Sequence, residues 1–427
     1  MKKYTTAEEA VKVIKSYDKV FVHGSAATPE VLLAALEKRA DELKQVNIIS
    51  LSTYGNMPIA QLKYKDSFYF NTLFVSQHTR ELITHGMGSY IPVFLSEIPA
   101  LFHRKFIVPD VALIHVSPPD KHGYCSLGVS VDICLSALKN AKYVIAQVNS
   151  KMPRTHGDGM IHVNEINALV EVEQSLPEID YTKEITEVEQ TIGKYCASLI
   201  EDGATLQMGI GSIPDAVLSM LENHKDLGVH TEMFSVGTIN LLKKGVITNK
   251  YKKKHRRKIA TSFAIGNRDM YDFIHDNPVC SFLESDYIND AYVIGKNPKV
   301  TAINSAIEID LTGQVCADSI GTKQFSGVGG QMDFMRGASI SEGGKPIIAM
   351  SSITNKGDSK IVPVLKEGAG VVSTRANVHY VITEYGIASL HGKNLIERAK
   401  ALIEIAHPAH REALDQAARI RFNNHSF

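Results

Sequence analysis

Short apolar runs alternate with longer amphipathic stretches along most of the chain. The apolar runs have the length of buried strands, and the amphipathic stretches have the period of helices. This alternation predicts an α/β fold with largely parallel sheets. We predict helices at Glu30–Leu43, Ile185–Ile200, Asp215–Leu221, Lys393–Ala406 and Glu412–Asn423. We predict strands at Val20–His23, Val46–Leu51, Val111–His115, Tyr143–Val148, Ala204–Met208, Val229–Phe234, Ile347–Met350 and Val378–Thr383.

The same pattern occurs twice. Residues 22–36 read V-H-G-S-A-A-T-P-E-V-L-L-A-A-L, and residues 207–221 read Q-M-G-I-G-S-I-P-D-A-V-L-S-M-L. Further pairs follow in the same order, and together they predict a duplication. These pairs are Asp120-x-x-Gly123 with Asp310-x-x-Gly313, Lys142–Ala146 with Lys345–Ala349, and Gly157-Asp158 and Ile161 with Gly357-Asp358 and Ile361.

The duplication predicts two similar α/β domains. Pro177 and a cluster of acids in Glu173–Glu187 separate the first copy from the long helix that opens the second. We place the domains at residues 1–180 and 181–427. Each has about the size of an ordinary domain and can bury its own core.

Composition narrows the class of protein without identifying it. The 427 residues include 46 basic and 46 acidic side chains, so the charge balance does not favour nucleic acid as a partner. No apolar run approaches the ~18 residues of a membrane span, and the polar N-terminus lacks the apolar core of a signal peptide. The five cysteines are scattered and predict neither disulfides nor a metal site. We expect a cytoplasmic protein without a membrane partner.

One local charge run stands out. Residues 250–258 read K-Y-K-K-K-H-R-R-K. Such a run is most often a solvated face, but it could also attract the anionic end of a phosphorylated ligand.

Two glycine-rich segments are candidates for ligand contact. A predicted strand leads into Gly209-Ile210-Gly211-Ser212-Ile213-Pro214 and then a helix, whose N-terminus favours phosphate. Pro214 occupies the third glycine position of the dinucleotide fingerprint G-x-G-x-x-G, which weakens that interpretation. Residues 325–334 read F-S-G-V-G-G-Q-M-D-F, and such a loop can supply N–H donors to an oxyanion. Either segment is also explained as a purely structural turn.

One acid is present in the second copy only. Aligning Gly55 with Gly237 places Glu232 opposite Ser50, near the end of a predicted buried strand. Ligands of parallel sheets bind at the carboxyl ends of strands, and a carboxylate there can be a base, a metal ligand or a nucleophile. A structural salt bridge explains Glu232 equally well.

In combination and order, the motifs resemble the acetyl-CoA hydrolase/transferase family of class I coenzyme A transferases. The nearest branch is similar to 4-hydroxybutyrate and butyrate CoA-transferases, and the resemblance covers nearly the whole chain. The motifs are V-S-P-P-D-x-H-G-Y at Val116–Tyr124, G-I-G-S-I-P at Gly209–Pro214, H-T-E-M-F at His230–Phe234, I-N-S-A-I-E-I-D-L-T-G-Q-V at Ile303–Val315, S-G-V-G-G-Q-M-D-F at Ser326–Phe334, T-E-Y-G-I-A-x-L-x-G-K at Thr383–Lys393 and I-A-H-P at Ile405–Pro408.

The resemblance implies two similar domains that face each other across an active-site cleft. Glu232 falls on the family's nucleophile, which forms a glutamyl-CoA thioester in a ping-pong reaction between acyl-CoA and a carboxylate. Glu384 matches a second glutamate, which orients the site. The N–H of Gly329 or Gly330 would stabilise the oxyanion. Coenzyme A would contact Gly209, Ile210, Gly211, Ser212, Ile213, Gly327 and Gly330.

The resemblance also implies the partners. We expect 4-hydroxybutyryl-CoA or butyryl-CoA with acetate as substrates, no permanently bound cofactor or metal, and a homodimer or homotetramer. Some relatives carry asparagine where this chain has Cys316, which we interpret as a small buried residue. If the duplication preserves the layout, the turn at Gly24-Ser25-Ala26-Ala27 faces the acid substrate.

Three alternatives remain open at this point. An acyl-CoA hydrolase would use water as the second acceptor on the same scaffold. A nicotinamide-dependent dehydrogenase would use Gly209-x-Gly211 and Glu232 for its dinucleotide, and a non-catalytic CoA-binding protein would not need Glu232. Five histidines are candidates for the cleft, and none has the H-E-x-x-H spacing of a zinc site: His23, His115, His122, His156 and His230. They are better explained as structural, and His122 and His156 are the strongest candidates for substrate contact.

Overall fold

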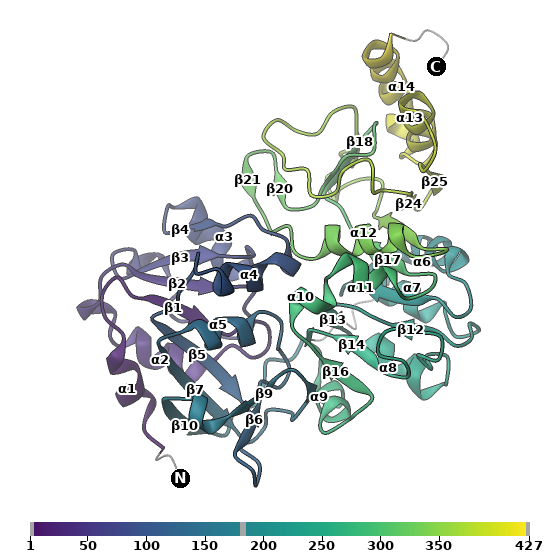
Figure 1. Cartoon of the computed structure of the whole chain (residues 1–427). Helices are drawn as coiled ribbons and strands as arrows, with labels where there is room; N and C mark the ends of the chain where they lie inside the picture. The colour runs from purple at the N-terminus through teal and green to yellow at the C-terminus, as the bar shows by residue number, and fades with distance from the viewer. Residues whose placement is uncertain (1–3, 180–184, 424–427) are drawn as a thin grey trace.

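The computed structural model describes residues 4–179 and 185–423, and it shows two lobes that each contain a largely parallel sheet (Figure 1). The first sheet has seven strands in the order β10-β7-β5-β1-β2-β3-β4. All of its pairings are parallel, as the alternating pattern predicts. The strands are β1 Lys19–Val22, β2 Val46–Ser50, β3 Phe68–Thr72, β4 Gly88–Tyr90, β5 Val111–Val116, β7 Tyr143–Asn149 and β10 Ala168–Val172.

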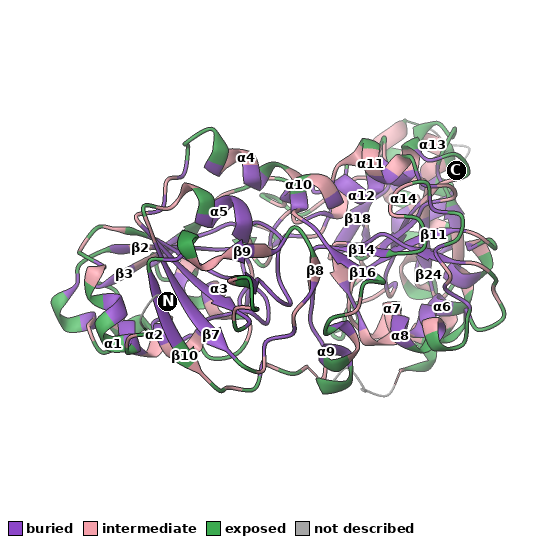
Figure 2. Cartoon of the chain, turned by 60° about the horizontal axis from the view of Figure 1, so that its bottom comes forward, coloured by how far each residue is buried: buried purple, intermediate pink, exposed green. Residues whose placement is uncertain are grey.

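The second sheet has six strands in the order β12-β11-β17-β22-β24-β25. Only the last pair, β24 with β25, is antiparallel. Its strands are β11 Thr205–Met208, β12 Gly228–Val229, β17 Thr301–Asn304, β22 Lys345–Ala349, β24 Tyr380–Thr383 and β25 Gly386–Ser389. The central strands of both lobes are buried, and the outward faces of the helices are exposed (Figure 2).

The strand orders confirm the duplication. When the strands are matched one to one along the two sheets, the order β10-β7-β5-β1-β2 of the first corresponds to β24-β22-β17-β11-β12 of the second. The paired motifs also adopt the same local structure. Asp120 Oδ1 accepts the Tyr124 N–H at 2.9 Å, and Asp310 Oδ1 accepts the Gln314 N–H at 3.0 Å. In each turn a glycine follows with positive φ, 85° at Gly123 and 95° at Gly313.

The helices agree with the pattern, although several bounds shift. They are α2 Glu30–Glu37, α6 Glu187–Leu199, α7 Ser212–Ser219, α13 Leu395–Glu404 and α14 Pro408–Phe422. The first predicted helix is too long, because the chain ends α2 at Glu37 and then forms a 3₁₀ turn at Ala40–Glu42. The last begins earlier than predicted, since Pro408 suits the first helical position.

One predicted strand is wrong as a single element. The run Val229–Phe234 is divided between β12 and β13 Met233–Phe234, because the chain changes sheets within it. β12 pairs with β11 of the large sheet, His230 pairs with Ala260, and β13 pairs with β15 Phe263–Ala264. Thr231 and Glu232 lie between these pairings and belong to no strand.

The two halves are joined by more than the linker. A three-stranded sheet contains β14 Ile259–Thr261 and β16 Cys280–Phe282 of the second half and β8 His156–Gly157 of the first. Residues of both halves also share one apolar core cluster. The predicted division between residues 180 and 181 lies outside the described residues. In the described part, no helix is both long enough and apolar enough to cross a membrane.

Candidate active site

The main chain at Glu232 is fixed from one side. Its carbonyl oxygen accepts hydrogen bonds from the Ser262 N–H at 2.9 Å, the Phe263 N–H at 3.0 Å and Thr261 Oγ1 at 3.0 Å. On the other side, Thr231 Oγ1 donates to the Met208 carbonyl at 3.1 Å, directly before the Gly209 turn. The change of sheets therefore places Glu232 beside the turn that the sequence predicts to bind a ligand.

The Glu232 carboxylate contacts an amide and a glycine. Asn289 Nδ2 donates to Glu232 Oε2 at 2.9 Å. A Cβ added at Gly330 would overlap both Glu232 Oε2 and Asn289 Nδ2, so a larger residue there must displace these side chains. Burial raises the pKa of Glu232, the Asn289 bond opposes that rise, and the charge of Asp132 adds to it. A structural salt bridge does not explain Glu232, since its described hydrogen-bond partner is a neutral amide.

The loop before Gly330 is held by the first half. Val328 N–H donates to the Tyr90 hydroxyl at 2.8 Å, and the Gly329 carbonyl accepts the Leu95 N–H at 3.0 Å. The Phe74 ring packs so closely that a Cβ at Gly327 would lie 2.8 Å from Phe74 Cδ2. The N–H groups of Gly329 and Gly330 have no acceptor among the described residues. They are thus free to donate to a ligand beside Glu232.

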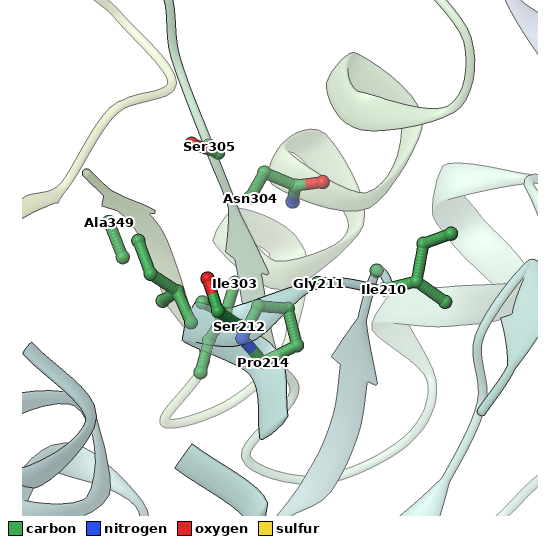
Figure 3. A pocket seen from close by; sticks show the side chains of 10 residues that line it. Ile210, Gly211, Ser212, Pro214, Ile303, Asn304, Ser305 and Ala349 are labelled. Atoms are coloured by element: carbon green, nitrogen blue, oxygen red, sulfur yellow. The ribbon is translucent and has the colours of Figure 1, made fainter. Parts of the chain in front are cut away.

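The Gly209 turn lines a pocket at the carboxyl end of β11 (Figure 3). The pocket has a volume of about 240 Å³. Gly211 has φ 118°, a value that side chains rarely adopt, and α7 begins at the next residue with Pro214 in its first turn. Ser212 Oγ bonds Glu189 of α6. The predicted CoA-contact residues of this turn therefore lie together, with Ile303, Asn304, Ser305 and Ala349 completing the wall.

Glu384 lies at the same edge of the sheet, where β24 ends. Its carboxylate accepts the Ser352 N–H at 2.9 Å and Ser352 Oγ at 2.5 Å. The charge of Glu384 also acts on Lys360, against the burial that lowers the Lys360 pKa. Glu384 thus holds the loop after β22. Among the described residues, no hydrogen bond joins Glu384 to Glu232.

The turn at Gly24-Ser25-Ala26-Ala27 in the first copy is buried and hydrogen-bonded to neighbouring main chain. Ser25 is 4% exposed and has φ 53°, and its N–H donates to the Ser52 carbonyl at 2.6 Å. A Cβ added at Gly24 would lie 3.9 Å from Asp132 Oδ2. Because the charge of Asp132 also acts on Glu232, the turn and the Glu232 carboxylate lie near the same side chain. The direct role of Ser25 toward an acid substrate stays a prediction.

The candidate histidines are structural where they are buried. His23 Nε2 lies 2.7 Å from the Ser130 carbonyl, and its Nδ1 accepts the His115 N–H. Burial lowers the pKa of His115 and of His230 to about 3, so both are neutral at ordinary pH. His156 pairs with Asp276 at 3.0 Å. No group of three or more His, Cys, Asp or Glu residues in the described chain is arranged to hold a metal ion.

Cys316 is engaged in the fold, and the basic stretch lies away from the Gly209 turn. The Cys316 side chain is buried, and its thiol donates to the Ser319 carbonyl at 3.0 Å. Lys252 is also buried and donates to the carbonyls of Val229 and Lys258. Lys253 lines a surface pocket with Gly203 and Lys299, which precede β11 and β17. The basic stretch therefore lies at the amino ends of the strands, opposite to the Gly209 turn.

Sequence reasoning missed three polar residues around Glu232. Asn289 lies between two short helices and belongs to none of the quoted motifs. Asp333 is the acid of the G-G-Q-M-D-F motif, and it lies 3.3 Å from Asn289 Nδ2. Asp132 follows Ser130, whose Oγ donates to Asp132 Oδ2 at 2.5 Å. Only Asp333 had a signal in the sequence, as a buried acid in the first turn of a predicted ligand loop.

Comparison with known proteins supplies the family. Residues 1–189 match the acetyl-CoA hydrolase/transferase N-terminal domain, and residues 266–418 match the C-terminal domain of the same name. The chain belongs to the acetyl-CoA hydrolase/transferase family. This identification agrees with the motifs on which the resemblance rests.

Two relatives of known activity are similar along nearly their whole length. The chain is 50% identical to a succinyl-CoA:acetate/propanoyl-CoA:succinate CoA transferase of Fasciola hepatica, over 97% of this chain and 87% of that protein. It is 48% identical to a 4-hydroxybutyrate coenzyme A transferase of Clostridium kluyveri, over 98% of each. The predicted enzyme class, a CoA-transferase of this family, is thereby confirmed, and the dehydrogenase and non-catalytic alternatives are wrong.

A solved structure confirms the fold. RipA from Yersinia pestis superimposes with a TM-score of 0.92 at 35% identity, covering 98% of each chain. The α/β architecture and the order of its elements are thus shared along the whole chain.

Proposed function

We propose that this protein transfers coenzyme A between an acyl-CoA and a short-chain carboxylate through a covalent intermediate on Glu232. One observation carries the proposal: the Glu232 carboxylate lies against an amide donor and a glycine loop with free N–H groups, and the residue before it, Thr231, bonds the strand end that leads into the Gly209 turn. A carboxylate is suited to this reaction, because it can conserve the energy of a thioester as an anhydride and return it.

The reaction proceeds by exchange of acyl and thiol groups. A Glu232 carboxylate oxygen attacks the thioester carbonyl carbon, the carbon–sulfur bond breaks, and coenzyme A leaves as the thiolate. The thiolate then attacks the glutamyl carbon of the anhydride and releases the first carboxylate, which leaves a glutamyl-CoA thioester. A second carboxylate reverses these steps and departs as the new acyl-CoA. Each step exchanges one bond for another, with no net oxidation and no proton required from outside.

The residues around Glu232 have separable roles in this scheme. The free N–H of Gly329 or Gly330 would donate to the oxyanion of the attacked thioester. The Gly209–Ile213 turn would hold coenzyme A, with the helix N-terminus at Ser212 favouring its phosphates. Glu384 would act through the Ser352 loop that it holds. We infer no permanently bound cofactor, because acyl-CoA, the carboxylate and the Glu232 side chain supply every reacting atom.

The substrates are proposed as 4-hydroxybutyryl-CoA or butyryl-CoA with acetate. The Clostridium kluyveri relative supports the first of these, and the Fasciola hepatica relative makes succinate the principal competitor. A panel of acyl-CoA donors with acetate, propionate and succinate as acceptors ranks the pairs by kcat/KM. We further propose a cytoplasmic homodimer or homotetramer, for which analytical ultracentrifugation and cell fractionation are the tests.

The covalent step is tested by borohydride after incubation with acyl-CoA. A glutamyl-CoA thioester is reduced, so activity is lost only after acyl-CoA treatment, and peptide mass spectrometry locates the modified side chain at Glu232. The Glu232→Gln variant should lose transfer by at least about a thousandfold while it keeps the wild-type circular dichroism. Normal transfer by Glu232→Gln, or modification of another residue, contradicts the mechanism.

A separate assay distinguishes transferase from hydrolase. Net thiol release from acyl-CoA measures attack of water on the intermediate, whereas transfer to acetate forms acetyl-CoA and leaves no free thiol. Sustained thiol release that acetate does not suppress, without formation of acetyl-CoA, identifies an acyl-CoA hydrolase on this scaffold.

A further inference from the structure

Asp333 and Glu232 accept hydrogen bonds from the same nitrogen of Asn289. Asp333 occupies the first turn of α12 Gln331–Ile340 and is 7% exposed. Asn289 Nδ2 lies 2.9 Å from Glu232 Oε2 and 3.3 Å from Asp333 Oδ2. The two hydrogens of one amide therefore serve two carboxylates.

The orientation of the Asn289 side chain depends on both acids. Asn289 is fully buried, and its Oδ1 has no hydrogen-bond partner among the described residues. If the amide were turned over, Oδ1 would face two acceptors and both hydrogen bonds would be lost. A single acid would leave one amide hydrogen without a partner, so Asp333 fixes the direction in which Asn289 donates.

Asp333 is itself held by the first half of the chain. Ser96 Oγ donates to Asp333 Oδ1 at 2.8 Å, and the Ser96 N–H donates to Asp333 Oδ2 at 3.1 Å. Ser96 belongs to a 3₁₀ turn, Leu95–Glu97, whose Leu95 N–H donates to the Gly329 carbonyl at 3.0 Å. One turn of the first half thus holds both the glycine loop and the acid behind Asn289.

We propose that Asp333 is a positioning residue of the transfer reaction: it orients Asn289 onto Glu232, and through Ser96 it makes that orientation depend on contact between the halves. The inference rests on the proposed function of Glu232 as the nucleophile. Asp333 touches no reacting atom in this scheme. It acts through the amide, so its removal should slow the covalent step and leave the substrate-binding turn unchanged.

Electrostatics gives this role a pH signature. Burial raises the pKa of Asp333 to about 7, its bonds to Ser96 oppose that rise, and the Glu232 charge adds to it. Two carboxylates that share a donor disfavour each other's ionised form. Because the Glu232 charge raises the pKa of Asp333, Asp333 is still protonated while Glu232 ionises, and a neutral side chain at this position should remove a step near pH 7 from the rate profile.

Four variants test the inference with acyl-CoA and acetate as substrates. Asp333→Ala removes the acceptor, Asp333→Asn keeps the shape without the charge, and Ser96→Ala removes one bond from the first half. Ser339→Ala, on the same helix with its hydroxyl bonded to the Arg336 carbonyl, is the matched control. For each variant we measure kcat, the KM of both substrates, the pH profile, and the rate of borohydride-trapped thioester formation on Glu232.

Asp333→Ala should lower kcat and the trapping rate by roughly ten- to a hundredfold, the effect of losing one hydrogen bond to a buried charged group, while the KM of acyl-CoA stays within about twofold. Asp333→Asn should lose less and should lack the step near pH 7. Ser96→Ala should lie between wild type and Asp333→Ala, and Ser339→Ala should match wild type.

The outcomes distinguish a failure of this inference from a failure of the proposed function of Glu232. Trapping at the wild-type rate in Asp333→Ala overturns the positioning role and leaves the Glu232 mechanism intact. If Asp333→Ala does not fold, an unchanged kcat and trapping rate in both Asp333→Asn and Ser96→Ala overturns it equally. A wild-type protein that forms no thioester on Glu232 overturns both proposals.

Discussion

A single methyl group added at Gly330 should lower the rate of transfer strongly. An alanine Cβ would occupy the space of Glu232 Oε2 and Asn289 Nδ2 and displace the proposed nucleophile. Because misplacing a reacting group by about 1 Å costs about a hundredfold in rate, Gly330→Ala should lower kcat by at least that factor. Steady-state kinetics measures the loss, with Ser339→Ala as the control on the same helix and thermal melting to verify folding. An active Gly330→Ala protein would show that the carboxylate can attack from another position.

The titration of Glu232 gives a second prediction at this scale. Burial raises its pKa above the ordinary value of 4.5, so the carboxylate is protonated at a higher pH than in water as the solution is acidified. A nucleophile must be ionised, and kcat/KM should therefore fall with decreasing pH through a midpoint above 4.5. The Asn289 bond lowers this pKa, so Asn289→Ala should move the midpoint upward. A midpoint at or below the ordinary value in folded wild type contradicts the assignment.

Sequence alone reached some residues of the site and not others. Glu232 was recognisable because only one copy of the repeat carries an acid there, and Gly330 because three glycines cluster before a helix. Asn289 was not recognisable, since it follows a four-residue helix and contacts Glu232 across 57 positions of sequence. Contacts of that kind are set by how the elements pack, which no local pattern records.

Among the elements, the turn between β11 and α7 is where binding can be weakened apart from chemistry. An added Cβ at Gly209 meets no atom within 4 Å, so a larger side chain enters the pocket and does not strain the fold. Gly209→Val should raise the KM of acyl-CoA by at least about tenfold, which is about 1.4 kcal/mol of binding free energy. The KM of acetate and the thermal midpoint should change little.

The control for this variant lies at the other end of α7. Ser219 is exposed and its hydroxyl bonds the Ala216 carbonyl, so Ser219→Ala changes the helix and not the pocket. Equal KM values for acyl-CoA in Gly209→Val and Ser219→Ala would show that coenzyme A does not use this turn.

Element prediction failed where the chain changed sheets. The apolar run Val229–Phe234 satisfies every local criterion for one strand, yet it supplies pairs to separate sheets on either side of Glu232. Periodicity reports which residues are buried but not against which partner. The break matters for the site, because Glu232 lies outside both strands and its side chain does not have to follow the alternation of a strand.

At the scale of the whole molecule, the duplication was the strongest feature of the sequence. Matching glycines, aspartates and lysines predicted two copies, and the strand orders β10-β7-β5-β1-β2 and β24-β22-β17-β11-β12 confirm them. The strand β8, which leaves the first half to pair with β16, had no such signal. Its sequence, His156-Gly157, is too short to show a period.

The distribution of charge gives the last prediction. Lys253 and Lys254 lie with the basic stretch at the amino ends of the strands, and their N–H groups both donate to Asn297 Oδ1 at 3.1 Å. Removing their side chains leaves those main-chain bonds intact. The double variant Lys253→Ala/Lys254→Ala should keep the KM of acyl-CoA within about twofold even at low salt, where surface charges act over the longest range. A KM that rises several-fold and recovers with added salt would assign the stretch a role in attracting substrate.

Because β8 pairs with β16, one part of the first half can complete its fold only late in synthesis. Every strand of the seven-stranded sheet is complete by Val172, and that sheet can form while the rest of the chain is still being made. His156–Gly157 cannot complete its own pairing with residues 281–282 at that time. At about 5–20 residues per second, the ribosome needs about 6–25 s to reach them. Nascent chains that end within this interval present a strand edge without its neighbour, and such edges are what chaperones and aggregating chains bind.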